Sequence, residues 1–110
     1  MTKKYCVVMT TTSREGNAES IIRYLLDNKL AACVQTQTIQ SHYLWEQEIC
    51  HDSEILISIK TRLSLYPQVE QAILAVHEYQ VPQIIQLPIC DGFSPYLAWI
   101  RESTAGLQDQ

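Results

Sequence analysis

The chain has 110 residues, of which 46% are hydrophobic and 18% are charged, and its formal net charge is -4. Such a chain is long enough for one globular domain, residues 1–110, and too short for two separate cores. No cluster of Lys or Arg offsets the negative charge, so we expect no nucleic-acid partner. The longest apolar runs fall far short of the roughly 18 residues that suggest a membrane span. We therefore expect no membrane partner and place the protein in the cytoplasm.

The first third of the chain predicts a buried strand followed by an amphipathic helix. Residues 5–9 form a short continuous apolar run, which is typical of a strand buried on both faces. Residues 10–16 are polar and predict a loop. From Asn17, which suits a helix N-cap, apolar residues recur with helical spacing as far as Leu30.

The middle of the chain predicts a long β-hairpin. Residues 33–45 are rich in Thr, Gln and aromatic residues and lack Gly and Pro, and residues 48–62 include alternating apolar and polar side chains. A two-residue turn at residues 46–47 sets His42 opposite His51. A hairpin of this length outruns a domain of this size, so we expect its tip to contact another copy of the chain.

The last third predicts a second helix, an edge strand and a short terminal helix. Residues 64–79 place apolar side chains on one helical face. Residues 84–89 form a strand in which Pro88 removes a backbone donor, as expected at an edge or at a strand end. A terminal helix starts at residues 94–96, and the polar tail, 103–110, is expected to fray.

The order of these elements, β-α-β-β-α-β followed by a helix, predicts an α+β protein with a ferredoxin-like antiparallel sheet. In this arrangement the two longer helices pack on one face of the sheet. The opposite face needs a cover, because soluble monomers rarely expose a large apolar surface. One short C-terminal helix cannot cover it all, so we expect self-association.

Five short motifs in a fixed order are more specific than any one of them. They are Leu30-Ala-Ala-Cys-Val34, Tyr43-Leu-Trp-Glu46, Lys60-Thr61, His77 with Tyr79 and Pro82, and Tyr96-Leu-Ala-Trp99. Through these motifs the chain resembles the CutA divalent-cation tolerance proteins over nearly its whole length. The resemblance implies a homotrimer whose long hairpins wrap neighbouring subunits, similar in plan to the PII signalling proteins. It also implies a response to copper and other divalent metals, without a settled enzymatic activity.

The resemblance further implies a candidate metal site. Bacterial members with a proposed copper site carry two adjacent His and a Cys, where this chain has Val76, His77 and Met9. Only His77 carries over directly, and Met9 offers a soft thioether suited to Cu(I). We therefore expect copper or another divalent metal to bind weakly, with no obligatory cofactor. The alternative for His77 is a hydrogen-bonded residue at the helix C-terminus, where a cation is favoured.

A second pair of candidate metal ligands lies on the predicted hairpin. In the register given above, His42 and His51 are cross-strand neighbours on one face, at a spacing compatible with sharing a metal ion. The alternative is a solvated or interface pair without a metal, since a shift of register by one residue moves a side chain to the other face.

Aromatic and charged residues in the matching motifs form a candidate pocket between subunits. They are Tyr43, Trp45, Glu46, Lys60, Tyr79 and Trp99. Charge beside aromatic walls suits a small anionic ligand, and Lys60 with Glu46 is the best candidate for the polar part of such a pocket. The alternative is packing, because Trp and Tyr also dominate interfaces that bind no ligand.

Three functions follow from these candidates. The one we favour is a non-enzymatic homotrimer that binds divalent metal ions, copper above all, and takes part in metal tolerance. The second is a PII-like sensor that holds a small anionic metabolite in the cleft between subunits. The third is a small-molecule enzyme with Glu46 as general base. The sequence has no Gly-x-Ser-x-Gly elbow and no glycine-rich phosphate loop to support catalysis.

Overall fold

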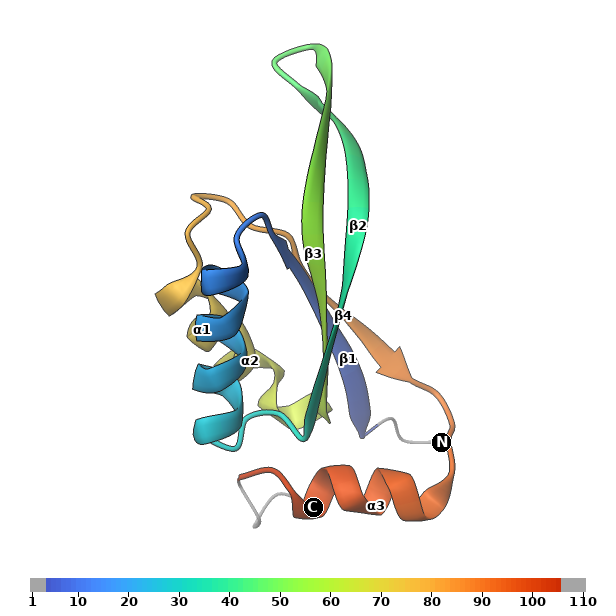
Figure 1. Ribbon diagram of the computed structural model, residues 1–110. Helices are drawn as coiled ribbons and strands as arrows, with labels where there is room; N and C mark the ends of the chain where they lie inside the picture. The colour runs from blue at the N-terminus through green and yellow to red at the C-terminus, as the bar shows by residue number, and fades with distance from the viewer. Residues whose placement is uncertain (1–3, 106–110) are drawn as a thin grey trace.

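The computed structural model describes residues 4–105, and it has the predicted α+β architecture (Figure 1). Within these residues, strands and α-helices follow in the order β1 (Tyr5–Thr12), α1 (Glu15–Asp27), β2 (Cys33–Trp45), β3 (Glu48–Arg62), α2 (Tyr66–Val76), β4 (Ile84–Ile89) and α3 (Ser94–Glu102). A short 3-10 turn, Leu63–Leu65, joins β3 to α2. The predicted element order is confirmed.

The sheet is antiparallel throughout, with the strand order β2-β3-β1-β4. The central strands β1 and β3 pair along the whole of β1, from Tyr5 opposite Arg62 to Thr12 opposite Ile55. Strand β4 carries Pro88 opposite Cys6 and lies at one edge of the sheet. This confirms the edge position predicted from the missing backbone donor of proline.

Helices α1 and α2 cover one face of the sheet and enclose the hydrophobic core (Figure 1). The fully buried apolar side chains of this core are Cys6, Val8, Ile57 and Ile59 from the sheet and Ile21, Leu25, Val69 and Ile73 from the helices. Alternate residues of β1 and β3 reach the core because successive side chains of a strand point to opposite faces. Burial of each large apolar side chain contributes about 1.5–3 kcal/mol.

The hairpin has the predicted bounds and the predicted register. Trp45 stands opposite Glu48, and His42 stands opposite His51. The two turn residues, Glu46 and Gln47, have φ values of 51° and 68°. Positive φ at both central positions matches a two-residue turn that follows the twist of the flanking strands.

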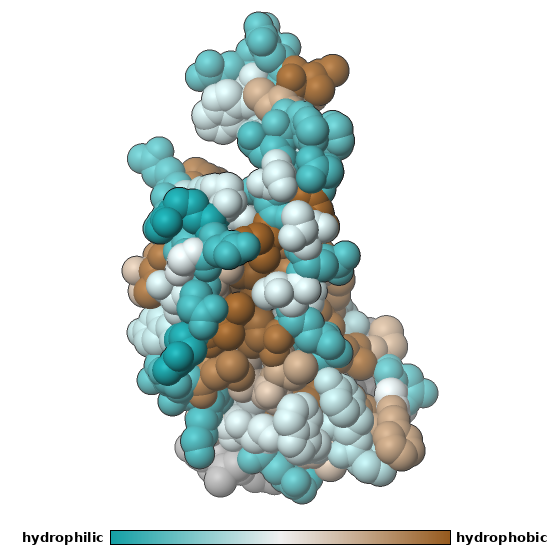
Figure 2. Space-filling model, in the orientation of Figure 1, coloured by the Kyte–Doolittle hydropathy of each residue, from teal (hydrophilic) through white to brown (hydrophobic). Residues whose placement is uncertain are grey.

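Beyond the end of β1, strands β2 and β3 pair only with each other and project from the body as the arm, residues 39–54 (Figure 1). A lone two-stranded hairpin is marginally stable in water. The tip nevertheless exposes Leu44, Trp45 and Ile49, at 75%, 64% and 81% of their surface. Apolar residues are visible near the tip in Figure 2. The arm therefore presents an apolar end without a cover in a single chain.

The face of the sheet away from α1 and α2 is called here the open face, and its apolar members are Val7, Met9, Ile85 and Leu87. The register sets Val7 beside Leu87 and Met9 beside Ile85. Ile85 and Leu87 are 45% and 48% exposed. Helix α3 lies across one end of the sheet, where Ile100 is fully buried, and leaves these side chains uncovered (Figure 1).

Several predicted boundaries of strands and helices are wrong. Residues 10–12 continue β1 instead of starting a loop, because they pair with β3 and are buried. Helix α1 begins at Glu15, so Asn17 is not its N-cap but a residue of its first turn, 2% exposed. Helix α2 ends at Val76 and does not reach Tyr79, because the backbone becomes extended at His77.

The C-terminal tail does not fray from Ser103 as predicted. Thr104 is buried, accepts a hydrogen bond from Arg62 Nε at 2.9 Å and donates one to the Ile100 carbonyl at 3.0 Å. The backbone N–H of Ala105 donates to the Lys29 carbonyl at 2.8 Å. The rest of the predicted tail, residues 106–110, lies outside the described residues.

Candidate functional site

A cavity of about 610 Å³, called here the arm-base cavity, lies where the arm leaves the body. The arm, the end of β1 and the loop between α2 and β4 form its walls. Its lining residues are Thr11, Ser13, Ser41, His42, Tyr43, Asp52, Glu54, Tyr79, Val81 and Gln83. Asp52 and Glu54 contribute carboxylates to this lining, and no Lys or Arg of residues 4–105 belongs to it.

Hydroxyl donors hold both carboxylates of the arm-base cavity. The Tyr79 hydroxyl donates to Glu54 Oε2 at 2.6 Å, and the Ser41 hydroxyl donates to Glu54 Oε1 at 2.7 Å. The Tyr43 hydroxyl donates to Asp52, and this bond is the main reason that the pKa of Tyr43 rises to about 12. Burial, and then the bond to Glu54, raises the pKa of Tyr79. Both phenols therefore stay neutral at physiological pH. The carboxyl groups of Asp52 and Glu54 make the cavity suitable for a cation.

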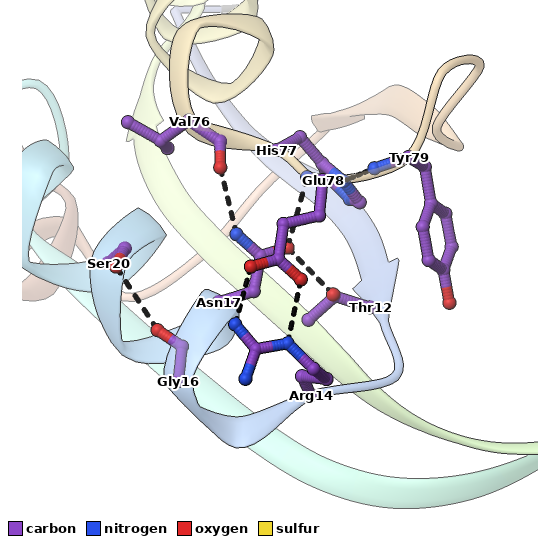
Figure 3. A network of polar contacts seen from close by, with 9 residues as sticks. All are labelled: Thr12, Arg14, Gly16, Asn17, Ser20, Val76, His77, Glu78 and Tyr79. Atoms are coloured by element: carbon purple, nitrogen blue, oxygen red, sulfur yellow. Dashed lines mark hydrogen bonds and ion pairs between the residues drawn. The ribbon is translucent and has the colours of Figure 1, made fainter.

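Asn17 ties the C-terminus of α2 to the first turn of α1 (Figure 3). Its Nδ2 donates to the Val76 carbonyl at 2.8 Å, and its Oδ1 accepts from the Thr12 hydroxyl at 2.8 Å and from the Glu78 N–H at 3.3 Å. Thr12 and Asn17 are buried, so these bonds satisfy groups that water does not reach. They fix the start of the loop that carries Tyr79 to the cavity.

Arg14 and Glu78 join the same two segments with an exposed ion pair (Figure 3). Arg14 Nε donates to Glu78 Oε1 at 2.8 Å, and Arg14 Nη2 donates to Oε2 at 2.5 Å, which is a two-pronged arrangement. The hydrogen bond from Arg14 is the main cause that lowers the pKa of Glu78. Solvent screens an exposed ion pair, so this pair adds only modestly to the stability that the hydrogen bonds of Asn17 give to the same contact.

His77 lies at the C-terminus of α2, and both of its ring nitrogens are in hydrogen bonds. Nε2 lies 2.9 Å from the Thr11 carbonyl oxygen, and Nδ1 accepts from the Tyr79 N–H at 3.0 Å. A carbonyl only accepts, so the ring is neutral with its proton on Nε2. Met9 lies two residues before Thr11 in β1, and its side chain belongs to the open face. In this arrangement His77 offers no free ring nitrogen to a metal ion, and the pair does not fit the copper site that the resemblance implied.

His42 and His51 come together on one face of the arm. Their rings stack with 4.4 Å between the centroids and 2° between the planes. His51 Nε2 lies 2.6 Å from Gln40 Oε1. Both histidines are exposed, so the stacked pair is open to solvent in a single chain.

The six residues predicted to line a pocket between subunits lie in separate places within one chain. Tyr43 and Tyr79 both line the arm-base cavity. Trp45 and Glu46 lie at the tip of the arm, where Trp45 is 64% exposed and Glu46 occupies the turn. The arm tip and the cavity are therefore distinct regions of the monomer.

Lys60 lies near α3, the helix that contains Trp99, toward the end of β3 that is far from the turn. Lys60 Nζ is 5.6 Å from the centroid of the Tyr96 ring, and that ring lies 5.7 Å from the ring of Trp99. Glu46 is at the other end of the hairpin, so Lys60 and Glu46 do not pair within one chain. A pocket built by several copies stays a prediction.

Two further features are absent from residues 4–105. No three His, Cys, Asp or Glu side chains of this part of the chain come close enough together to hold a metal ion. No helix in the same range has the length and apolar character that crossing a bilayer requires.

The sequence-based prediction missed the acidic and hydroxyl groups of the arm-base cavity. A signal for them existed, because Asp52 and Glu54 alternate along β3 and the predicted register sets Asp52 opposite Ser41. It also missed the role of Asn17. No local pattern separates an Asn that caps its own helix from one that bonds to α2, and the partner Val76 is 59 residues away.

The chain matches one protein family over nearly its whole length. Residues 6–103 match the family model of the CutA1 divalent ion tolerance protein. The divalent-cation tolerance protein CutA of Thermus thermophilus is 38% identical over 99 residues, which cover 89% of this chain and 96% of that protein. Protein CutA of Homo sapiens is 40% identical over 90% of this chain, which spans 56% of the human protein.

Solved structures agree with the sequence comparison. CutA1 of the psychrotrophic bacterium Shewanella sp. SIB1 superposes with a TM-score of 0.90 at 36% identity, covering 96% of this chain and 100% of that one. CutA1 of Oryza sativa superposes with a TM-score of 0.89 at 38% identity, covering 94% and 96%. The chain belongs to the CutA1 family of divalent ion tolerance proteins.

Proposed function

We propose that the protein binds divalent metal ions, copper among them, and contributes to metal tolerance as a homotrimer without catalytic activity. The observation that carries this proposal is the charge of the arm-base cavity, which Asp52 and Glu54 line and no Lys or Arg does. Relatives named for divalent-cation tolerance support the same class of ligand.

The carboxylates of the cavity favour cations both by their charge and by their oxygen atoms, which can act as metal ligands. Asp52 and Glu54 are two residues apart on one strand, so both carboxylates are on the same side of the arm. Carboxylate oxygens and water are ligands that hard divalent ions accept, and a cavity of about 610 Å³ leaves room for bound water. We therefore expect weak binding of a partly hydrated ion, drawn to the arm by its charge.

Two uncovered apolar surfaces support self-association. The open face presents Ile85 and Leu87 at nearly half of their surface, and the arm tip presents Leu44 and Ile49 at 75% and 81%. Such side chains are typical of the buried centre of homo-oligomer interfaces. The number of subunits, three, comes from the resemblance to CutA proteins.

Calorimetry and thermal unfolding of chelator-stripped protein test the proposal. We expect Cu(II) and Zn(II) to bind and to raise the melting temperature by several degrees, because a ligand at 100 times its Kd stabilises the native state by about 2.7 kcal/mol. Nucleotides and organic acids are expected to leave the melting temperature unchanged. A chain that binds no divalent metal contradicts the proposal.

A charge-matched pair of variants shows whether the arm attracts the ion. Replacing Asp52 and Glu54 with Asn and Gln removes two charges at the cavity, and we expect metal affinity to fall about three- to tenfold. The control replaces Glu19 and Asp27 of α1 with Gln and Asn, which removes two exposed charges elsewhere. Equal affinity losses in both variants point to net charge alone and against the cavity.

One observation favours the anion sensor as a second candidate function. Lys60 Nζ lies over the Tyr96 ring, and among residues 4–105 no carboxylate forms an ion pair with Lys60. A cation beside aromatic rings suits a small anionic metabolite. A melting-temperature rise with such anions and none with metals favours this candidate, provided that Lys60→Gln abolishes the rise.

We keep the cytoplasm as the proposed compartment. Some relatives carry other locations in their names, such as the chloroplastic protein CutA of Arabidopsis thaliana and a periplasmic CutA of Archaeoglobus fulgidus. Cell fractionation with an antibody against the protein tests this assignment. Recovery outside the cytoplasmic fraction contradicts it.

A further inference from the structure

We propose that His42 and His51 form a two-histidine clip that binds Cu(II) or Zn(II) across the two strands of the arm. The clip rests on the proposed metal-binding function and gives it nitrogen ligands on the face of the arm opposite to Asp52 and Glu54, whose charge draws the ion to the arm. The two residues stand directly opposite each other in the register of β2 and β3. Their rings are parallel to within 2°, with centroids 4.4 Å apart, and both side chains are exposed.

The hydrogen bond of His51 prepares the ring for a metal. Gln40 Oε1 accepts from His51 Nε2 at 2.6 Å, and the Gln40 amide nitrogen is directed to the Ser53 hydroxyl at 3.4 Å. With the proton on Nε2, the lone pair of His51 is on Nδ1. Histidines that bind metals usually donate their other N–H to a carbonyl or carboxylate in this way, which fixes the tautomer and the ring orientation.

The spacing of the rings is close to what one shared ion requires. Two imidazole nitrogens that are each about 2.0–2.1 Å from a metal ion lie about 3–3.5 Å from each other. The ring centroids are 4.4 Å apart, which is about 1 Å more than that spacing. The nitrogen lone pairs lie in the ring planes, so two parallel rings do not point at one ion as they stand. Because both side chains are exposed, rotation about their side-chain torsions can turn one nitrogen of each ring toward a shared ion without moving the backbone.

The chemistry of the pair selects the kind of metal. Imidazole nitrogen suits copper and zinc, and among divalent first-row ions Cu(II) binds such sites most tightly. Cys50 precedes His51 and therefore points to the other face of the arm, so it adds no thiolate. Two protein ligands leave the remaining positions to water, which gives an open and weak site.

The contrast with His77 strengthens the assignment. Both nitrogens of His77 are engaged, with the Thr11 carbonyl and the Tyr79 N–H. A metal must break one of these bonds before it binds there, whereas His51 keeps one nitrogen available and His42 has no hydrogen-bond partner among residues 4–105. The favoured histidine ligands are therefore His42 and His51 on the arm, and not His77 at the end of α2.

Metal binding at the clip has a mechanical consequence. Residues 39–54 pair with no third strand, so the arm is held along its length by the ladder between β2 and β3. An ion that bridges His42 and His51 adds a cross-link between these strands. We therefore expect slower amide hydrogen exchange in the arm when Cu(II) or Zn(II) is bound.

A histidine scan tests the clip completely, because the chain has three histidines. Cu(II) and Zn(II) are titrated by calorimetry into chelator-stripped wild type, His42→Gln, His51→Gln, the double variant and the control His77→Gln. We expect each arm variant to lose at least tenfold in Cu(II) affinity and His77→Gln to keep the wild-type affinity. Circular dichroism confirms that each variant is folded before titration.

The outcomes separate the clip from the function on which it rests. Wild type that binds metal and a double variant that binds it equally well overturn the clip and leave metal binding intact. Wild type that binds no divalent metal overturns both. Loss of binding in His77→Gln alone, with both arm variants unchanged, assigns the site to α2 and overturns the clip as well.

A spectroscopic readout distinguishes ligation from an indirect structural effect. Electron paramagnetic resonance of the 1:1 Cu(II) complex is expected to show hyperfine structure from two imidazole nitrogens in wild type and from one in either single arm variant. Hydrogen exchange of residues 39–54 is expected to slow with metal in wild type and to stay unchanged in the double variant. A spectrum without nitrogen ligands in wild type contradicts the clip.

Discussion

Thr10 and Thr12 are two residues apart on β1, and both side chains face the layer between the sheet and the helices. Both are buried, at 0% and 1% exposure. Thr12 donates its hydroxyl proton to Asn17 Oδ1, but the Thr10 hydroxyl has no hydrogen-bond partner among residues 4–105. The two threonines are therefore equally buried, but only the hydroxyl of Thr12 has a hydrogen-bond partner.

Replacing each threonine with valine is expected to change stability in opposite directions. Thr10→Val removes an unpaired buried hydroxyl at nearly constant volume, so the free energy of unfolding rises by about 1 kcal/mol. Thr12→Val removes a partner of Asn17, and the free energy falls by about 1–2 kcal/mol. Urea unfolding of both variants checks the pair. A loss of stability in Thr10→Val contradicts the reasoning.

The ion pair of Glu78 with Arg14 is expected to make stability depend on acidic pH. The pKa of Glu78 is lowered from its ordinary value of 4.5, chiefly by the hydrogen bond from Arg14, so folding favours the ionised carboxyl. The stabilisation is complete above the ordinary pKa and is lost as the pH falls through the lower folded pKa. The exposed position makes the effect small and sensitive to salt.

Glu78→Gln isolates this contribution. Wild type is expected to be slightly more stable than the variant at neutral pH, and the difference is expected to shrink below about pH 4. Thermal unfolding of both proteins across this pH range measures the difference. The control compares Arg14→Gln with the double variant Arg14→Gln/Glu78→Gln. Without Arg14, the pH-dependent difference in stability between the two proteins is expected to be absent. A gap that is constant with pH contradicts the assignment.

The two strands of the hairpin and the start of α3 at Ser94 were predicted correctly, whereas the ends of α1 and α2 were not. Residues 33–45 and 48–62 lack Gly and Pro and have one two-residue bend, so both bounds and register follow from the local pattern. The N-cap of α1 was predicted three residues late, at Asn17 instead of Arg14, because Asn is a common cap residue. Its actual partners are in β1 and after α2, which no local pattern contains.

In the candidate site, too, features set by the local sequence were predicted and features set by distant contacts were not. His42 and His51 were paired correctly because one turn determines their register. The environment of His77 was not predictable, because its ring contacts the Thr11 carbonyl, 66 residues away in the sequence. The acidic cavity was missed for a related reason, since its walls come from three segments that only the fold brings together.

The backbone conformation of the hairpin turn limits the stability of the arm. Gln47 has a φ of 68°, and a non-glycine residue in this region pays a cost that glycine does not. Gln47→Gly is therefore expected to raise the free energy of unfolding by about 0.5–1 kcal/mol and to slow hydrogen exchange in the arm. The control Glu48→Gly changes the first residue of β3, where glycine lowers stability by weakening the strand. Equal effects of the two variants contradict a role of the turn.

At the scale of the whole molecule, the chain is elongated and leaves several surfaces without partners. Its principal extents are 46 × 28 × 21 Å, and the arm accounts for its long shape (Figure 1). Within residues 4–105, β2 and β4 are the edge strands of the sheet, and each has one side without a neighbouring strand. The open face and the arm tip expose apolar side chains, and the tip is visible in Figure 2. Copies of the chain can cover these surfaces for one another.

These uncovered surfaces predict that copies of the chain associate. Static light scattering at micromolar concentration is expected to give three times the 12.6 kDa of one chain. Replacing Leu44 and Ile49 with Ser removes apolar surface at the arm tip, so we expect a lower mass with the secondary structure retained. The control replaces Leu26 and Leu74, which are 40% and 45% exposed on α1 and α2, with Ser and is expected to keep the wild-type mass. A wild-type mass of one chain, with the fold intact, contradicts the role assigned to the arm.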